Sequence, residues 1–416
     1  MNWARHFRKA AAEFFASNSR LTSYIMQNNQ ALTLTEYLLK YHRAIKDIGA
    51  ADWSSLLGDN DNPFVSYAFL DALENSGTIR KSYGWQPLHL AIYDTQGNLS
   101  AACPGYLKQN SHGEFIFDWA WANAYAQNGL DYYPKLLCAV PYSPVTGPRL
   151  LARDRASKRA LILAMQQSCT ELSLSSAHAN FLELEDTALF REAGWLARTD
   201  IQFHWRNPSE RKWQYFADFL AAMSAKKRKN ILQERAKVAK AGLRIERRSG
   251  LELNADLWAQ IHALYQLTFD SKGNTPALTK AFFLDFAARS PLQVLAVLAF
   301  DNKDTMIAMA LCFRSSSTLY GRYWGASVDI PGLHFECCYY QGIEYCLEHG
   351  LDTFEPGAQG EHKLARGFLP TQTHSSHYIV DRRFREGIAR HLAEERRQRD
   401  AYQAELLQHS PFIAEA

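Results

Sequence analysis

The alternation of apolar and polar positions divides the chain into two stretches that predict nearly the same order of elements. In the first stretch, apolar runs flank the polar segment Asp94–Asn98, which indicates a hairpin. Four aromatic residues at every second position, from Phe115 to Trp121, predict a strand with one aromatic face. The remaining pattern predicts helices over 64–75, 156–172 and 186–193 and strands over 178–184 and 196–205.

The second stretch repeats this order. Runs 293–300 and 305–313 predict a hairpin around Asp301–Asp304. The pattern then predicts strand 318–325, helix 333–349, strand 352–356, a short helix near 361–366 and strand 371–380. Between the two stretches it predicts helices near 212–222, 225–241, 255–269 and 278–289, and a basic helix over 382–408 closes the chain.

A weak internal repeat supports two related domains. Gly194-Trp195-Leu196 matches Gly367-Phe368-Leu369 at an offset of 173, and His204-Trp205 matches His377-Tyr378 at the same offset. Chance similarity is the alternative. We therefore expect an α/β protein with an N-terminal extension over 1–45, a first domain over 46–206 and a second over 207–416.

The N-terminal residues carry four cations and interleaved aromatic side chains such as Trp3 and Phe7. This composition is typical of an amphipathic surface helix with peripheral membrane contact through 1–25, or of a leader. A start at Met26, with a mis-assigned extension before it, is the alternative.

Composition excludes several classes of protein. Of the 416 residues, 47% are apolar and 21% are charged, which excludes a mainly disordered chain. No run reaches the roughly 18 uncharged apolar residues of a membrane-spanning helix. The seven cysteines include no C-x-x-C pair, so we expect reduced thiols in a cytoplasmic protein and no metal site.

The charge is unevenly distributed. The window from Lys226 to Arg248 holds ten cations and two acids, which gives it +8, while the rest of the chain sums to −5. Ser224 is a suitable N-cap and Gly242 a suitable C-terminal residue for a helix here. Lys226, Lys227 and Arg228 then lie in the first turn, where the helix dipole disfavours cations. A bound polyanion would relieve that conflict; an ordinary solvated helix is the alternative.

The loop from Phe354 to Gly367 concentrates polar chemistry in the second domain. It carries Glu355, Gln359, Glu361, His362, Lys363 and Arg366. At the offset of 173, Glu361, His362 and Lys363 fall on Ala188, Leu189 and Phe190, so the first copy is apolar there. The asymmetry indicates one catalytic domain and one degenerate domain with a structural or acceptor-binding role.

Two long motifs resemble those of a known family. The element order resembles the GNAT acyltransferase fold, and its tandem arrangement resembles the Fem aminoacyltransferases, which add amino acids to peptidoglycan precursors. SAKKRKNILQERAKVAKAG and FEPGAQGEHKLARGF are similar to Fem motifs. The span from about 61 to 412 resembles bacterial Fem-like proteins labelled peptidoglycan biosynthesis or recognition. The segment Gly325–Leu333 lacks the [QR]-x-x-G-x-[GA] loop of acetyl-CoA enzymes, which favours aminoacyl-tRNA as donor.

The resemblance and the residues together suggest roles for acyl transfer to an amine. We expect catalytic roles for Lys363, Glu355, Glu361 and His362, with Lys363 assigned by its match to the Fem lysine. We expect the donor to contact Lys226, Lys227, Arg228, Arg322, Tyr323 and Arg366. We expect the acceptor to contact Glu336, Tyr340, Gln359, Lys135 and Arg149.

Three functions remain open on the sequence. The first is an N-acyltransferase that uses an activated acyl donor, aminoacyl-tRNA by the Fem resemblance, and an amine acceptor such as a cell-wall precursor, with no tightly bound cofactor and no DNA partner. The second is an acyl-CoA-dependent N-acetyltransferase. The third is a non-catalytic module that binds polyanions or peptidoglycan precursors. The oligomeric state is left open.

Overall fold

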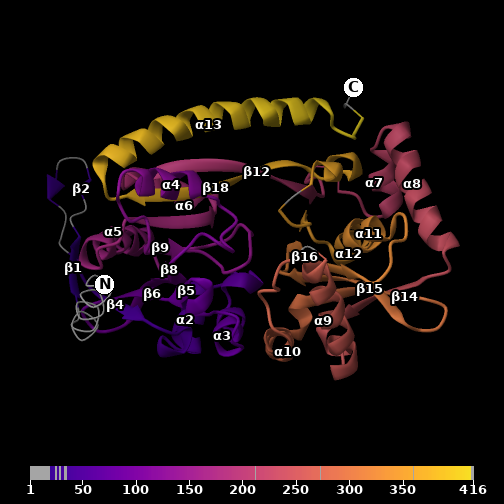
Figure 1. Ribbon diagram of the computed structural model, residues 1–416, viewed down its shortest axis with the longest axis horizontal. Coiled ribbons are helices and arrows are strands. Elements are labelled where there is room, and N and C mark those ends of the chain that lie inside the picture. Colours follow the sequence, from indigo (N-terminus) through magenta and orange to yellow (C-terminus); the bar gives the residue numbers. More distant parts are fainter. Residues whose placement is uncertain are drawn as a thin grey trace. The chain divides into compact units, whose positions relative to one another are not determined.

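The computed structural model describes residues 19–23, 26–27, 30–31, 35–210, 212–271, 273–358 and 360–413. Its contacts divide the chain into two units (Figure 1). Unit 1 comprises residues 1–60, 64–200 and 373–397, and unit 2 comprises 61–63, 201–372 and 398–416. Both units are discontinuous in sequence, so the predicted domain bounds at 46–206 and 207–416 stay a prediction.

Unit 1 contains an antiparallel sheet in the order β1 (Ser19–Ser23), β4 (Thr35–His42), β6 (His89–Tyr93), β7 (Leu99–Cys103) and β10 (Leu151–Ala152). The hairpin between β6 and β7 is confirmed, and the Asp94 carboxylate accepts the backbone N–H groups of Gln96 and Asn98 at 2.9 and 2.8 Å. Strand β4 pairs with β6, so residues 35–42 of the predicted extension belong to this sheet. The aromatic residues Trp3 and Phe7 lie outside the described residues.

A second group of strands completes unit 1. Residues 373–379 of β18 (Leu369–Ile379) pair antiparallel with β11 (Ser176–Leu182), which pairs parallel with β9 (Lys135–Cys138). Strands β8 (Gly105–Lys108) and β5 (Trp85–Pro87) follow. The main core packs these strands against α5 (Arg155–Glu171) and α6 (Leu184–Glu192). The other helices of this unit are α2 (Ala50–Leu57), α3 (Tyr67–Asn75) and α4 (Trp119–Gln127).

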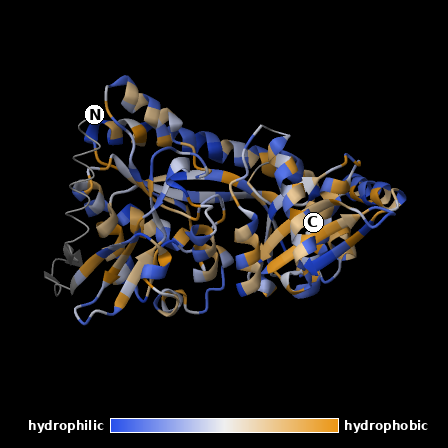
Figure 2. Ribbon diagram, turned by 60° about the horizontal axis from the view of Figure 1, so that its bottom comes forward, coloured by the Kyte–Doolittle hydropathy of each residue, from blue (hydrophilic) through white to orange (hydrophobic). Residues whose placement is uncertain are grey.

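Unit 2 is built on a mixed sheet. Strands β13 (Arg244–Ser249), β14 (Val294–Phe300), β15 (Met306–Arg314) and β16 (Thr318–Ala326) pair antiparallel in that order. Strand β16 then pairs parallel with β17 (Thr353–Glu355), which pairs antiparallel with the end of β12 (Leu196–Arg206). Strands β14 and β15 are buried almost throughout, and strands of this unit show the hydrophobic colour in Figure 2.

Helices surround this sheet. They are α7 (Phe216–Ala221), α8 (Ala225–Lys240), α9 (Ala255–Asp270) and α10 (Lys280–Arg289). A continuous helical segment follows, made of α11 (Leu333–Phe335), a π-helical turn (Glu336–Tyr340) and α12 (Gln341–His349). A 3-10 helix spans Glu361–Arg366, and α13 spans Arg382–Gln408, both with the predicted bounds. The mixed α/β class is therefore confirmed.

Two sequence predictions about elements were wrong, and one strand was not predicted. Residues 115–121 form no strand: a bend leads into α4 at Trp119, and the exposed Phe117 and Trp119 (48% each) produced the alternation. The helix predicted from 64 begins at Tyr67, because Ser66 caps it by accepting the N–H of Phe69. Strand β13 was missed because its arginines read as a continuation of the basic window.

The repeat appears in local geometry. Gly194 and Gly367 both adopt positive φ, 80° and 91°, where a helical turn gives way to a strand. In each copy the next N–H donates to the carbonyl five residues earlier, from Trp195 to Phe190 and from Phe368 to Lys363. This hydrogen bond is typical of a glycine-terminated helix. The matched glycines therefore perform the same structural task.

Among the described residues, no helix combines the length and the apolar character needed to span a bilayer.

Candidate functional site

The parallel pairing of β16 and β17 is short. Only Thr318–Tyr320 and Thr353–Glu355 pair. A pocket of about 80 Å³ lies past this point, entirely within unit 2. It is lined by β15, β16, the helical segment and Pro356, through Ala310, Leu311, Cys312, Gly321, Arg322, Tyr323, Trp324, His334, Cys338, Tyr339 and Pro356.

A β-bulge shapes one wall of this pocket. Leu311 lies opposite Tyr323 and Cys312 opposite Gly321, so Arg322 is an extra residue on β16. Such a bulge bends its strand and redirects a side chain. Arg322 lines the pocket, and burial lowers its pKa. Arg322, predicted to contact the donor, therefore brings a guanidinium to the pocket.

Tyr323 lies differently from its neighbour. Its ring packs against Tyr265, Phe283 and Phe313 at centroid distances of 5.2, 5.7 and 6.4 Å. Successive residues of a strand point to opposite faces of the sheet. The side chain of Tyr323 therefore belongs to an aromatic core, although the residue contributes to the pocket wall.

Lys363 is a buried cation next to the pocket. Its side chain comes from the 3-10 helix and the residue is 2% exposed. Its Nζ donates a hydrogen bond of 2.7 Å to the carbonyl of Gly357, the residue after Pro356. Burial lowers the pKa of Lys363 to about 8, the Arg322 cation lowers it further, and Cys338 raises it. The lysine is therefore mostly protonated at neutral pH, at a free-energy cost.

Glu355 ends β17, and its charge acts on the Arg322 guanidinium. Its Oε1 lies 4.0 Å from Nδ1 of His204, which is on the end of β12 that belongs to unit 2. Burial lowers the pKa of His204 to about 3, and Arg206 and Lys363 lower it too. The imidazole is therefore neutral at physiological pH, and this pair is not an ion pair.

His334 and Cys338 form a wall that sequence reasoning did not assign to a site. They are four residues apart in the helical segment and both line the pocket. Burial lowers the pKa of His334 to about 4. Its ring packs edge-on against Trp324 at 5.2 Å and Tyr339 at 5.4 Å. The i,i+4 spacing of polar side chains after the loop 326–332 was the available signal.

Glu336 and Tyr340 are not among the residues that line the pocket, and their acceptor-binding role stays a prediction. Two oxygens of Glu336 accept hydrogen bonds of 2.9 and 3.0 Å from Arg235 of α8. Tyr340 donates to Glu234 of the same helix. Residues two positions apart on a helix lie on nearly opposite sides. The pocket side is taken by His334 and Cys338, which leaves Glu336 and Tyr340 to hold α8.

Of the remaining loop residues, Glu361 and His362 are exposed, while the side chain of Arg366 is 11% exposed. Glu361 accepts a hydrogen bond from Tyr402, and Nε2 of His362 lies 2.9 Å from the hydroxyl of the pocket-lining Tyr339. Arg366 pairs with Glu234 at 2.6 Å and stacks on Phe335 at 3.4 Å. Gln359 lies outside the described residues. The roles of Glu361, His362, Arg366 and Gln359 stay predictions.

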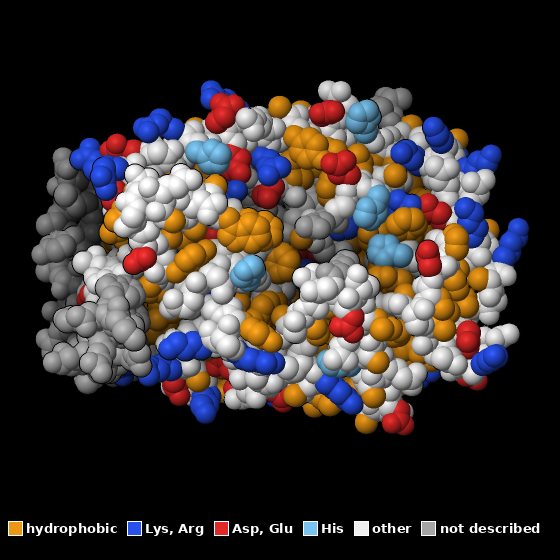
Figure 3. All heavy atoms as spheres, in the orientation of Figure 1, with side chains coloured by type: hydrophobic (Ala, Val, Ile, Leu, Met, Phe, Trp, Pro, Cys, Tyr) orange, Lys and Arg blue, Asp and Glu red, His pale blue; other side chains and the backbone are white. Residues whose placement is uncertain are grey.

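The first turn of α8 displays the predicted cations. Ser224 is at the N-cap without a side-chain hydrogen bond, and its N–H donates to Pro411 at 2.9 Å. Lys226 is exposed, and Lys227 and Arg228 are half-buried. Lys and Arg side chains gather along the margin where α8 lies (Figure 3). Their donor-binding role stays a prediction.

Lys135 and Arg149, predicted to contact the acceptor, are interior residues of unit 1, and that role stays a prediction. Lys135 donates to Glu114 at 2.8 Å, Asp118 at 2.5 Å and Ser111 at 2.9 Å. Arg149 donates to backbone carbonyls, including that of Asn180 at 3.0 Å. Both are fully buried, and these partners occupy their donors. They stabilise loops.

The cysteines form no disulfide within the part of the chain that the structure describes. All seven cysteines are free thiols. No group of three or more His, Cys, Asp or Glu side chains within those residues has the arrangement of a metal site.

Comparison with known proteins finds one family and several similar structures. A family model described as FemAB-like, peptidoglycan biosynthesis/recognition, matches residues 44–414. The C-terminal domain of a proposed lysylphosphatidylglycerol synthetase from Agrobacterium fabrum is 10% identical, with a TM-score of 0.50, over 83% of this chain and 95% of that one. L-PGS from Bacillus licheniformis is 10% identical, with a TM-score of 0.50, over 82% and 96%. FemX is 10% identical, with a TM-score of 0.49, over 84% and 99%.

No protein among the curated sequences matches the chain. The two synthetase structures share the fold of this chain, which agrees with the predicted α/β class.

Proposed function

This chain belongs to the FemAB-like family of peptidoglycan biosynthesis and recognition, and we propose that it is an N-acyltransferase. It moves an acyl or aminoacyl group from an activated donor to an amine, with a cell-wall precursor as the acceptor that the family description suggests. The observation that carries the proposal is the buried Lys363 cation beside the pocket past the β16–β17 pairing.

The proposed chemistry forms one amide bond. The amine nitrogen attacks the donor carbonyl carbon, the carbonyl oxygen becomes negative, and the bond to the leaving oxygen or sulfur then breaks. The amine loses a proton and the leaving group gains one. Fixed cations stabilise the oxyanion more strongly in a buried site than in water. Lys363 and Arg322 supply such cations.

The proton has two acceptors in unit 2. Glu355, at the end of β17, is held on a strand and can orient the amine or take its proton. His334 lines the pocket and is neutral because burial lowers its pKa to about 4. His334 faces the pocket directly, but its lowered pKa of about 4 makes it a weak base. We assign the proton to Glu355 and the positioning of the amine to His334.

The donor is proposed to be aminoacyl-tRNA. The cations in the first turn of α8 are suited to phosphates, and Lys226 is exposed. Acyl-CoA is the second candidate, because its phosphates can use the same cations.

A transfer assay separates these donors. The chain is mixed with labelled aminoacyl-tRNA, or with labelled acyl-CoA, and with a peptidoglycan precursor whose stem peptide has a free amine. Label on the amine that disappears after RNase treatment supports the tRNA donor. RNase-resistant transfer from acyl-CoA supports the second donor. Binding of donor and precursor with no transfer from either overturns the enzymatic proposal.

A further inference from the structure

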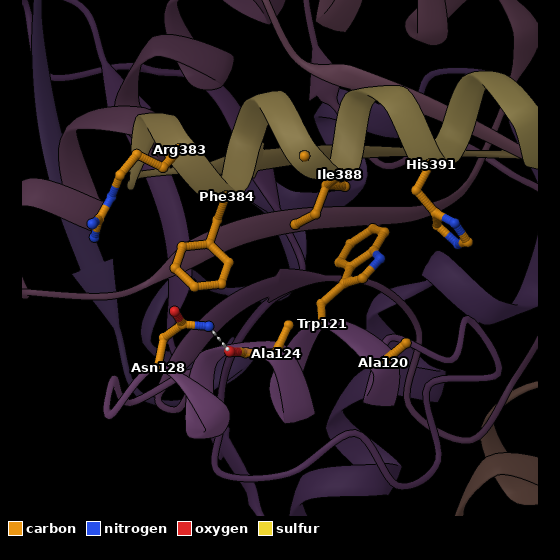
Figure 4. Close-up of a pocket in the computed structure, with 9 residues that line it drawn as sticks. Ala120, Trp121, Ala124, Asn128, Arg383, Phe384, Ile388 and His391 are labelled. Carbon is orange, nitrogen blue, oxygen red and sulfur yellow. Dashed lines mark hydrogen bonds between the residues drawn. The ribbon is translucent and has the colours of Figure 1, made fainter.

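A second cavity lies within unit 1, between α4 and the first half of α13 (Figure 4). Its volume is about 380 Å³, which lies in the range of about 300–1,000 Å³ typical of small-molecule sites. It is lined by Ala120, Trp121, Ala124, Asn128, Arg383, Phe384, Gly387, Ile388 and His391. We call it the α4–α13 groove.

Small residues create the space in this groove. Ala120 and Ala124 line it from α4 and Gly387 lines it from α13. A Cβ atom added to Gly387 would meet nothing within 4 Å. Glycine within a helix costs about 1 kcal/mol relative to alanine, so the helix gives up stability at a position that keeps the groove open.

Packed aromatic side chains form the groove's apolar surface. Trp121 is almost fully buried, and its ring meets His377 edge-on at 4.9 Å. Phe384 packs against Tyr125 at 4.1 Å. Phe384, Ile388 and Trp121 point toward one another across the groove in Figure 4. A linear apolar chain would contact these three side chains.

The groove is preformed, because α13 is attached firmly to unit 1. Arg198 donates to both carboxylate oxygens of Glu395 at 2.8 and 2.9 Å. Arg385 donates to the carbonyl of Ile379 at 2.6 Å. These bonds fix the helix on either side of the groove, so a ligand would enter without moving the helix.

The charge of the groove selects for an anion. None of its nine lining residues is acidic, and Arg383 and His391 stand at opposite ends (Figure 4). Arg383 also donates to both carboxylate oxygens of Asp381 outside the groove, from Nε at 3.4 Å and from Nη2 at 3.1 Å, yet its side chain is 80% exposed. An exposed arginine has donors left for a carboxylate, which its planar guanidinium binds through two hydrogen bonds.

We propose that the α4–α13 groove binds a fatty-acid-type molecule, with one linear apolar chain and a carboxylate. The volume of about 380 Å³ equals that of about a dozen water molecules at roughly 30 Å³ each, so it suits a single chain of medium length. That is one chain, not the two of a diacyl lipid. The chain lies along Trp121, Phe384 and Ile388, and the carboxylate binds Arg383. The inference is independent of the transfer reaction in unit 2.

Isothermal titration of the full chain with dodecanoate, below its micelle concentration, tests the proposal. We expect saturable binding at one site. Dodecyltrimethylammonium has the same chain and the opposite charge, and we expect it not to bind. Equal binding of the two amphiphiles, or binding of a lysophospholipid but not of dodecanoate, overturns the assignment.

Two variants locate the site. Gly387→Leu fills the groove, and we expect it to weaken dodecanoate binding by at least about tenfold while raising the melting temperature, because leucine favours helix more than glycine. Ala126→Leu, an exposed position on α4 that does not line the groove, is the matched control and leaves binding unchanged. Undiminished binding by a folded Gly387→Leu protein places the ligand elsewhere and overturns the proposal.

Discussion

Replacing Lys363 by methionine should make the protein more stable and inactive at once. The pKa of Lys363 falls from 10.5 to about 8 in the folded chain, which corresponds to about 3 kcal/mol against folding while the lysine is protonated. Methionine fills the same space without charge. It loses the hydrogen bond to Gly357, worth about 1 kcal/mol. The net expectation at pH 7 is about 2 kcal/mol of added stability.

The pH dependence identifies the cause. Below pH 8 both the folded and the unfolded states bind the proton, so wild type carries the full penalty. Between pH 8 and pH 10.5 the folded protein has lost the proton of Lys363 while the unfolded chain still binds it. The free-energy cost of burying the charged lysine therefore decreases as the pH rises and is absent above 10.5. The advantage of Lys363→Met in urea unfolding should therefore shrink between pH 8 and pH 10.5.

The turnover number of Lys363→Met is the second measurement. Loss of one oxyanion-stabilising group lowers kcat by about 10² to 10³, and the same loss is expected in Lys363→Met. Lys303→Met, at an exposed turn of unit 2, is the matched control and should change neither quantity. A Lys363→Met protein that is less stable than wild type at pH 7 refutes the reasoning, because the lysine would then be a structural cation.

Four further predictions follow from the same contacts. Activity should fall as the pH rises through about 8, where Lys363 loses its proton, and a pH–rate profile of Lys363→Arg should lack that fall below pH 10. Joint replacement of Lys226, Lys227 and Arg228 by alanine should weaken donor binding and lower its salt dependence in filter binding; unchanged affinity at low salt contradicts this. Arg235→Ala should cost about 3 kcal/mol in urea unfolding, because it leaves the 4% exposed Glu336 without its cation; a loss below 0.5 kcal/mol, on the order of a surface pair, would mean the pair is dispensable. Lys135→Met should also destabilise the fold, by about 3 to 5 kcal/mol, because Glu114 and Asp118 are left buried without their partner; a change in KM without a change in stability would restore its acceptor role.

Much of the fold could be read from periodicity. Asp94 marks the β6–β7 hairpin and Asp301 marks the β14–β15 hairpin, each through a carboxylate that accepts backbone N–H groups. The helix over 382–408 was predicted with the bounds that it has. These features depend on residues close in sequence, which a pattern can reveal.

Long-range contacts could not be read in the same way. The sequence places Lys135 in a proline-rich region, but only the fold brings Glu114 and Asp118 to it and encloses all three. The orientation of Glu336 depended on which side of its helix faces α8, and Arg235 decides that. Periodicity alone left both sides of this helix open, so His334 and Cys338 were missed.

The central claim, that acyl transfer takes place past the short β16–β17 pairing, is tested most directly by the structure of a donor complex. Crystals are soaked with an amide-linked aminoacyl-adenosine, a stable mimic of the tRNA terminus, and separately with an acyl-CoA. We predict acyl density between β16 and the helical segment that starts at Leu333, with its carbonyl oxygen facing Lys363 or Arg322. Density for either donor bound at any other part of the chain, with the pocket empty at saturating concentration, would contradict the account.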